Sequence, residues 1–224
     1  MKMEEITFIT EDGVKISGNY FKPKKEPALV FLLLHMMPST KESWNEFAAH
    51  LQNKGFAALA IDLRGHGRST DKNGTRLDYK EFKDSEHRES MKDIAAAKEF
   101  LKGQDVDISG MAIAGASIGA NLALWQASID KDVLLLILLS PGLNYRGIQA
   151  AQLAPHYSGP VYILASEMDT TNAAQSSREL FKIFPGDKEL KIIQGNSHGT
   201  NMFIQEPDLI DKLLEGTTSK IYKY

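Results

Sequence analysis

A serine between two glycines, at Gly115-Ala116-Ser117-Ile118-Gly119, lies between an apolar run and a helical pattern. A strand, a sharp turn and a helix form the context in which a Gly-x-Ser-x-Gly motif exposes a nucleophile. Small neighbours let such a turn close, and the first N–H groups of the helix face the reacting atoms. Ser117 is therefore the candidate nucleophile.

A serine hydroxyl needs a general base, and the base needs an acid that orients it. In an open α/β sheet, functional groups gather beyond the carboxyl ends of the strands. Of the six histidines, only His156 and His198 follow Ser117. His198 lies in a loop of small residues after the last predicted strand, whereas His156 lies beside Pro155 and follows no strand. His198 is the predicted base.

The predicted acid is Asp169, which comes just after an apolar run at 161–165. Two alternatives stay open. Asp169 could instead cap the helix that follows, since aspartate is a favoured N-cap residue. Glu167, two residues nearer the strand, could take the place of Asp169. The preceding strand ends in Ser140-Pro141-Gly142, which offers no acid.

A tetrahedral intermediate needs N–H donors that already face its oxyanion. One predicted donor is the backbone N–H of Ile118, the residue after the nucleophile. The other is the N–H of Met37 or Met36, in the loop after the third predicted strand. The side chains of Met36, Met37, Leu143 and Leu153 are expected to line the substrate pocket.

The elements that must position these residues alternate along the chain. Apolar runs without alternation predict buried strands at 29–34, 56–61, 111–114, 133–139, 161–165 and 190–193. Helical patterns fall at 43–54, 89–101, 118–128, 173–184 and 207–215. Strands at 4–10 and 15–22 form an opening hairpin. The pattern predicts an α/β fold, a doubly wound and mostly parallel sheet with an antiparallel N-terminal hairpin.

Several finer expectations accompany this fold. The run at 133–139 is the most apolar and is expected at the sheet centre, and Ser43 is expected to cap its helix with Glu46 as partner. Residues 70–88 are expected to be a long surface connection. The whole chain, 1–224, is expected to be one domain, with a short, partly helical excursion at 144–158 in place of a cap.

Bulk composition limits the function. A net charge of −3 gives no reason to expect a nucleic acid or an anionic membrane as partner. The absence of cysteine excludes disulfides, thiolate catalysis and cysteine-bound metals. No glycine-rich phosphate turn or metal-ligand spacing is present, so neither a cofactor nor a metal is expected. Without an apolar leader at the N-terminus, we expect a cytoplasmic protein, either a monomer or a weak homo-oligomer.

With these residues in view, the chain resembles the α/β-hydrolase superfamily, most closely its small serine esterases and dienelactone-hydrolase-like members without a large cap. The resemblance rests on Leu34-His35, the stretch Asp62-Leu63-Arg64-Gly65-His66-Gly67-Arg68-Ser69, the Ser117 motif, Asp169 and His198. In the family, the residues corresponding to Asp62, Arg64 and His66 are structural. This chain departs from the family twice. It has Met36 where glycine usually follows the histidine, and Ser117 where dienelactone hydrolases use cysteine.

The resemblance implies a serine hydrolase that cleaves small carboxylic esters through an acyl-enzyme. A thioesterase, an amidase or peptidase, and an acyltransferase would use the same three residues. A non-catalytic binding protein on this scaffold is the remaining class, but such a protein would be expected to have lost one of Ser117, Asp169 and His198. The expected partner is a small ester molecule.

Overall fold

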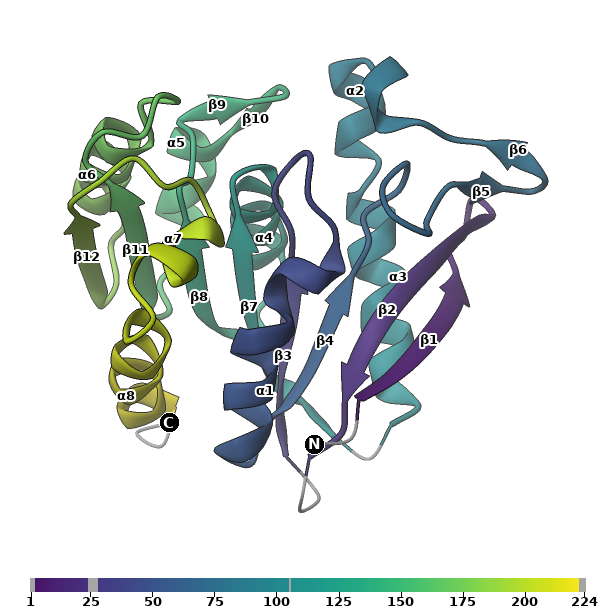
Figure 1. Cartoon of the computed structure of the whole chain (residues 1–224), viewed down its shortest axis with the longest axis horizontal. Coiled ribbons are helices and arrows are strands. Elements are labelled where there is room, and N and C mark those ends of the chain that lie inside the picture. The colour runs from purple at the N-terminus through teal and green to yellow at the C-terminus, as the bar shows by residue number, and fades with distance from the viewer. Residues whose placement is uncertain (1–2, 24–27, 105, 222–224) are drawn as a thin grey trace.

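The computed structural model describes residues 3–23, 28–104 and 106–221, and Figure 1 shows their arrangement. The strands of the main sheet are β1 (Met3–Ile9), β2 (Val14–Phe21), β3 (Leu29–Leu34), β4 (Ala57–Ile61), β5 (Asp71–Lys72), β6 (Thr75–Arg76), β7 (Asp107–Ala116), β8 (Val133–Leu139), β11 (Val161–Ser166) and β12 (Lys188–Ile193). The helices are α1 (Asn45–Asn53), α2 (Asp84–Arg88), α3 (Met91–Lys102), α4 (Ile118–Ile129), α5 (Ala150–Leu153), α6 (Ala173–Ile183), α7 (Asn201–Gln205) and α8 (Leu209–Ile221). Short 3-10 turns are η1 (Lys41–Trp44), η2 (Tyr79–Glu81) and η3 (Ala154–His156).

Within the described residues, the main sheet has the strand order β12-β11-β8-β7-β3-β4-β2-β5-β6, with β1 paired to β2. The pairs from β12 to β4 are parallel, and β2 runs antiparallel to β4. This confirms the predicted mostly parallel sheet with an antiparallel N-terminal hairpin. The strand β8 is interior but not central, because β3 and β7 occupy the middle. An apolar run reports only that both faces of a strand are covered.

Helices cover both faces of the sheet, so the molecule has three layers (Figure 1). Side chains of α3, α4 and α6 pack on one face, and those of α1, α7 and α8 pack on the other. The strand β3 shows why its sequence lacks alternation. Val30, Leu32 and Leu34 contribute to the first core, while Phe31 and Leu33 contribute to the second.

The 70–88 segment is more structured than expected. Its strands β5 and β6 form a hairpin that extends the sheet from β2, with Asn73 and Gly74 at the turn, both at positive φ. An Asn-Gly pair is a strong signal for a two-residue hairpin turn. Strands of two residues are too short to show alternation, which is why the segment was expected to be an irregular connection.

The start of the first helical segment also differs from expectation. Ser43 lies inside η1 and its hydroxyl donates to Thr40 O, so it caps nothing, and α1 begins after Trp44 without a side-chain cap. A 3-10 turn thus occupies the place where the sequence predicted the first turn of an α-helix. At the other end, Gly55 follows α1 at φ +96°, as a residue that ends a helix.

The excursion after β8 contains the separate hairpin β9 (Asn144–Tyr145) and β10 (Ile148–Gln149), followed by α5 and η3. Ala150, Ala154 and Tyr157 pack into the same core as α4. The segment therefore serves as the crossover from the end of β8 to the start of β11. None of the helices in the described ranges is long and apolar enough to cross a membrane.

Candidate active site

Ser117 lies in a strained turn between β7 and α4. Its backbone has φ 53° and ψ −116°, a conformation that non-glycine residues rarely adopt. A Cβ added at Gly115 would lie 2.1 Å from Gly119 O, and one added at Gly119 would lie 2.3 Å from Leu34 O. The two glycines are therefore required by close backbone packing, as the motif predicts. The Ser117 N–H donates to Leu139 O of β8 at 2.8 Å, which fixes the turn on the sheet.

Asp169 and His198 are in direct contact. The His198 Nδ1 lies 2.7 Å from Asp169 Oδ2, and the Asp169 side chain is almost fully buried while His198 is partly exposed. The other carboxylate oxygen accepts from the N–H and the hydroxyl of Thr171, at 3.0 and 2.8 Å. Burial by itself would raise the pKa of Asp169, but the hydrogen bonds from His198 and Thr171 outweigh it and hold that pKa below its usual value. An ionised carboxylate only accepts, so Nδ1 carries a proton, and in the neutral imidazole Nε2 is then the nitrogen with the lone pair.

The contacts at this strand end bear on both alternatives, namely Asp169 as a helix cap and Glu167 as the acid beside His198. The N-cap residue of α6 is Asn172 rather than Asp169, so Asp169 does not cap that helix. Glu167 is exposed and forms an ion pair with Arg178. Backbone bonds from Glu167 to Ile193 O and from Met168 to Gly195 O tie this loop to the loop that carries His198. Of the two acids, only Asp169 is bonded to the imidazole.

The loop of His198 is packed against β7, the strand that leads to Ser117. Gly199 has φ +56°, and a Cβ added there would lie 3.2 Å from the Cβ of Ala116, the residue before Ser117. The Gly199 N–H donates to the Ser140 hydroxyl at 3.0 Å. The structure thus brings the neighbours of Ser117 and His198 into contact at one edge of the sheet, beyond the carboxyl ends of β7, β8 and β12.

The loop after β3 reaches the same edge. Met36 is buried, and its sulfur would lie 2.5 Å from a Cβ at Gly199 and is 4.0 Å from the Thr200 hydroxyl. The Met36 carbonyl accepts from Ser39 N–H and from the His35 ring, which fixes the turn. Since His35 Nε2 accepts from Leu63 N–H and burial lowers its pKa to about 4, the His35 ring is a neutral structural group.

The two predicted oxyanion donors remain predictions. Ile118 is the first residue of α4, where backbone N–H groups have no partner within the helix. Met37 is half-buried and packs toward the core on the α4 side, opposite to Met36. The two methionines thus leave the loop on opposite faces of the sheet, with their shared backbone at the edge where Ser117 lies.

The other predicted pocket residues lie near α4. Leu143 is half-buried and follows Gly142, whose backbone N–H and C=O bond to the Asn121 side chain one turn after Ser117. Leu153 lines a cavity of about 240 Å³ together with Trp125 and Gln149, and no predicted triad residue lines it. The place of both leucines in a substrate pocket stays a prediction.

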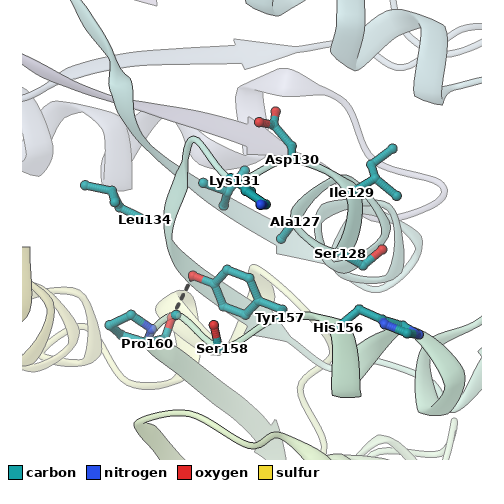
Figure 2. Close-up of a pocket in the computed structure, with 12 residues that line it drawn as sticks. Ala127, Ser128, Ile129, Asp130, Lys131, Leu134, His156, Tyr157, Ser158 and Pro160 are labelled. Atoms are coloured by element: carbon teal, nitrogen blue, oxygen red, sulfur yellow. Dashed lines mark hydrogen bonds between the residues drawn. The ribbon is translucent and has the colours of Figure 1, made fainter.

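A larger cavity, of about 490 Å³, lies elsewhere (Figure 2). The end of α4, the start of β8 and the residues just before β11 line it, including His156. These segments belong to the amino ends of β8 and β11, away from Ser117, so His156 takes no part in the candidate site. Among the residues that the structure describes, no three His, Cys, Asp or Glu side chains cluster as metal ligands.

The glycine-rich loop after β4 is held by two buried ionic groups. Asp62 accepts from the N–H and the ammonium of Lys41, at 2.8 and 3.1 Å, and from Arg68 N–H at 2.9 Å. Arg64 bonds Asp93 of α3 and Asp12 of the opening hairpin. These contacts give Asp62 and Arg64 a structural place, consistent with what the family resemblance implies.

Thr171 and Ser140 also support the site, although the sequence analysis did not predict either of them. Thr171 holds the carboxylate of Asp169, and its position two residues after an aspartate is typical of an Asx turn. Ser140 holds the loop of His198 from the end of β8, where the sequence offers no acid. Its contact joins residues 59 apart in the chain, which no local pattern reveals.

The mostly parallel sheet with helices on both faces is the fold of the α/β hydrolases. A comparison with protein families matches residues 25–151 to the family described as serine aminopeptidase S33. The chain belongs to this family, and it is an α/β hydrolase.

Curated relatives carry several activities. Similar sequences include the acyltransferase drtE of Aspergillus calidoustus, 31% identical over 70% of this chain and 49% of the relative. A bifunctional esterase/perhydrolase of Acinetobacter calcoaceticus is 29% identical over 59% of this chain and 44% of the length of that relative. The thiohydrolase apmlB of Arthrinium phaeospermum is 32% identical over 62% and 43%. The chain thus spans about half the length of these relatives.

Solved structures of similar fold match almost end to end. DcsB in complex with a substrate analogue superposes with a TM-score of 0.83 at 15% identity, over 98% of this chain and 99% of that one. The α/β hydrolase GrgF from a Penicillium species gives 0.80 at 16%, over 99% and 100%. An esterase from Pyrococcus furiosus gives 0.76 at 17%, over 98% and 92%. These likenesses show the fold.

Proposed function

We propose that the protein is a serine hydrolase that cleaves small carboxylic esters through an acyl-enzyme. The observation that carries this proposal is the buried Asp169 carboxylate bonded to His198, whose loop packs on the residue before a strained Ser117. The serine, the carboxylate and the imidazole occur along the chain in the order that α/β hydrolases use, with Ser117 first, Asp169 second and His198 last.

In the proposed mechanism, the Ser117 Oγ attacks the ester carbonyl carbon while His198 Nε2 takes the hydroxyl proton. The oxyanion accepts hydrogen bonds from the N–H of Ile118 and from an N–H of Met37 or Met36. As the tetrahedral intermediate collapses, the imidazolium gives its proton to the leaving alcohol, and an ester to Ser117 remains. His198 then deprotonates a water that attacks this ester and releases the acid. Asp169 stabilises the imidazolium in both halves.

The test is turnover of a panel of p-nitrophenyl esters, with a thioester and an anilide for comparison. The wild type is expected to hydrolyse the short esters, and Ser117→Ala is expected to lower kcat by at least about 10³-fold while the fold is retained. Circular dichroism and the unfolding midpoint serve as the control for folding. Equal turnover by the variant, or no turnover of any substrate by the wild type, would contradict the proposal.

An acyltransferase is the second candidate, because one relative at 31% identity bears that name. The acyl-enzyme would be the same, but an alcohol or thiol would attack it in place of water. Adding an alcohol acceptor during ester turnover distinguishes the two. Acyl transfer well beyond the share expected from competition with water favours a transferase, whereas release of free acid favours a hydrolase.

A further inference from the structure

We propose that Ser140 is a positioning residue for His198, an inference that rests on the proposed function. Ser140 follows β8, and the hydrogen bonds of Leu139 and Ser140 together reach the segments that carry all three proposed catalytic residues. Its predecessor, Leu139, accepts the backbone N–H of Ser117 at 2.8 Å. Its own N–H donates to Leu164 O at 2.7 Å, on the strand that leads to Asp169. Its hydroxyl accepts the N–H of Gly199, the residue after His198, at 3.0 Å.

The hydroxyl of Ser140 matters because the amide it accepts is buried. Gly199 fits between Met36 and Ala116 so closely that a Cβ would meet them at 2.5 and 3.2 Å. A buried N–H without an acceptor is unfavourable, so the loop must shift or admit water when the hydroxyl is removed. Because His198 directly precedes Gly199, either change would displace its imidazole.

The backbone of Ser140 supports the same conclusion. Its φ is 50°, a region in which glycine would be unstrained and serine is not. Ser140 is only 2% exposed, so its hydroxyl is not hydrated by bulk solvent. What serine offers here that glycine lacks is the hydroxyl oxygen that accepts the Gly199 N–H. The strain of this residue is therefore offset by the contact that holds the loop of His198.

Two substitutions separate the hydroxyl from the strain. Ser140→Ala removes the acceptor and keeps the backbone strain, whereas Ser140→Gly removes the acceptor and relieves the backbone. The matched control is Ser177→Ala on α6, because Ser177 is fully buried and its hydroxyl has no partner among the described residues. Each variant is compared by kcat, by KM and by the proton resonance of the imidazole N–H that His198 donates to Asp169.

We expect Ser140→Ala and Ser140→Gly each to lower kcat by roughly 10- to 100-fold with KM within about threefold, because small misplacements of catalytic groups cost about this much. The low-field imidazole resonance is expected to shift or broaden in the alanine and glycine variants and to stay unchanged in Ser177→Ala.

The proposal is overturned if Ser140→Gly is as active as the wild type, since the hydroxyl would then be dispensable. It is also overturned if Ser140→Ala keeps the wild-type kcat and imidazole resonance. The resonance does not depend on turnover, so it reports on Ser140 even if the wild type hydrolyses no ester. Failure of the proposed function is thus distinguished from failure of this inference.

Discussion

His198 and Asp169 are 29 residues apart in the chain and lie 2.7 Å apart through Nδ1 and Oδ2. The strands β11 and β12 are parallel neighbours, so the loops that follow them end at the same edge of the sheet. Thr171 holds the second carboxylate oxygen, which leaves Oδ2 for the imidazole. These contacts therefore fix the geometry of the pair and select the Nδ1–H tautomer of the neutral ring.

The first prediction concerns this pair. Asp169→Asn is expected to lower kcat by about 10⁴-fold, because an amide in place of the carboxylate favours the wrong imidazole tautomer. Glu167→Gln is the matched control, since Glu167 is exposed and bonds Arg178. Its kcat is expected to stay within about threefold of the wild type. Steady-state kinetics with one short ester check both, and the reverse ranking would show that Glu167 orients His198.

The second prediction concerns the turn at Ser117. Gly119→Ala places a Cβ 2.3 Å from Leu34 O, a backbone atom of β3 that cannot move freely. We expect the free energy of unfolding to fall by about 3 kcal/mol or more.

Gly103→Ala is the control for that experiment, because its Cβ would lie 3.5 Å from its nearest neighbour, Phe100 O, at ordinary contact distance. We expect that substitution to change the free energy of unfolding by less than about 1 kcal/mol. Urea unfolding measures both variants. Equal stability of Gly119→Ala and the wild type would contradict the packing described at this turn.

The third prediction is that acid destabilises the fold through buried histidines. Burial lowers the pKa of His35 to about 4 and that of His66 to about 3. In the unfolded chain each takes up a proton at about pH 6.5. Between these values the unfolded state binds more protons than the folded state, so the free energy of unfolding rises with pH and is lost as pH falls.

A variant isolates this contribution. Burial raises the pKa of Asp93 to about 6, which acts in the opposite direction, so the wild-type curve alone does not separate the two. His66→Phe keeps a ring stacked on Tyr79 but cannot titrate. Its slope of unfolding free energy against pH should be smaller by about one proton between pH 4 and 6. His156→Gln, at an exposed position, is the control, and identical slopes for His66→Phe and the wild type would contradict the prediction.

The fourth prediction is that the site favours short acyl chains. The segments available to cover it are small, since α2 has five residues and α5 has four. Arg88 of α2 donates to Arg146 O, so α2 is in contact with the β9–β10 turn that precedes α5. A shallow apolar pocket gains only about 0.8 kcal/mol per buried methylene, and the gain ends where the chain reaches water.

Activity should therefore be highest for acetyl to hexanoyl esters and should fall for longer chains. Rates with tributyrin are measured below and above its solubility limit. We expect no jump in rate when the emulsion forms. A preference for acyl chains of about twelve carbons, or such a jump, would show a deep tunnel or a lid.

Much of the fold followed from local sequence. The run at 29–34 matches β3 at both ends because a strand covered on both faces is apolar throughout. The glycines around Ser117 indicated the turn correctly, because close backbone contacts admit only glycine. Likewise, Asp169 and His198 were expected at one edge of the sheet because each follows a predicted strand, and they lie together there after β11 and β12.

The remainder depends on contacts that are distant in the chain. The contact of Ser140 with Gly199 arises from the order of β7, β8, β11 and β12 in the sheet, which no single stretch encodes. The hairpin β5–β6 was missed because two-residue strands carry no period, although Asn73-Gly74 marks its turn. The spacing of Ser43 and Glu46 predicts a capping box, whereas the Ser43 hydroxyl donates to Thr40 O within a 3-10 turn.

The most direct test of the central claim is covalent labelling of the nucleophile. A fluorophosphonate reacts with a serine only where a base activates the hydroxyl and N–H donors bind the phosphonyl oxygen. Intact and peptide mass spectrometry should find one adduct per chain, on Ser117, with turnover lost in proportion to labelling. Ser117→Ala should take up no label under the same conditions. An adduct on another serine, or full ester turnover by a chain labelled at Ser117, would contradict the account.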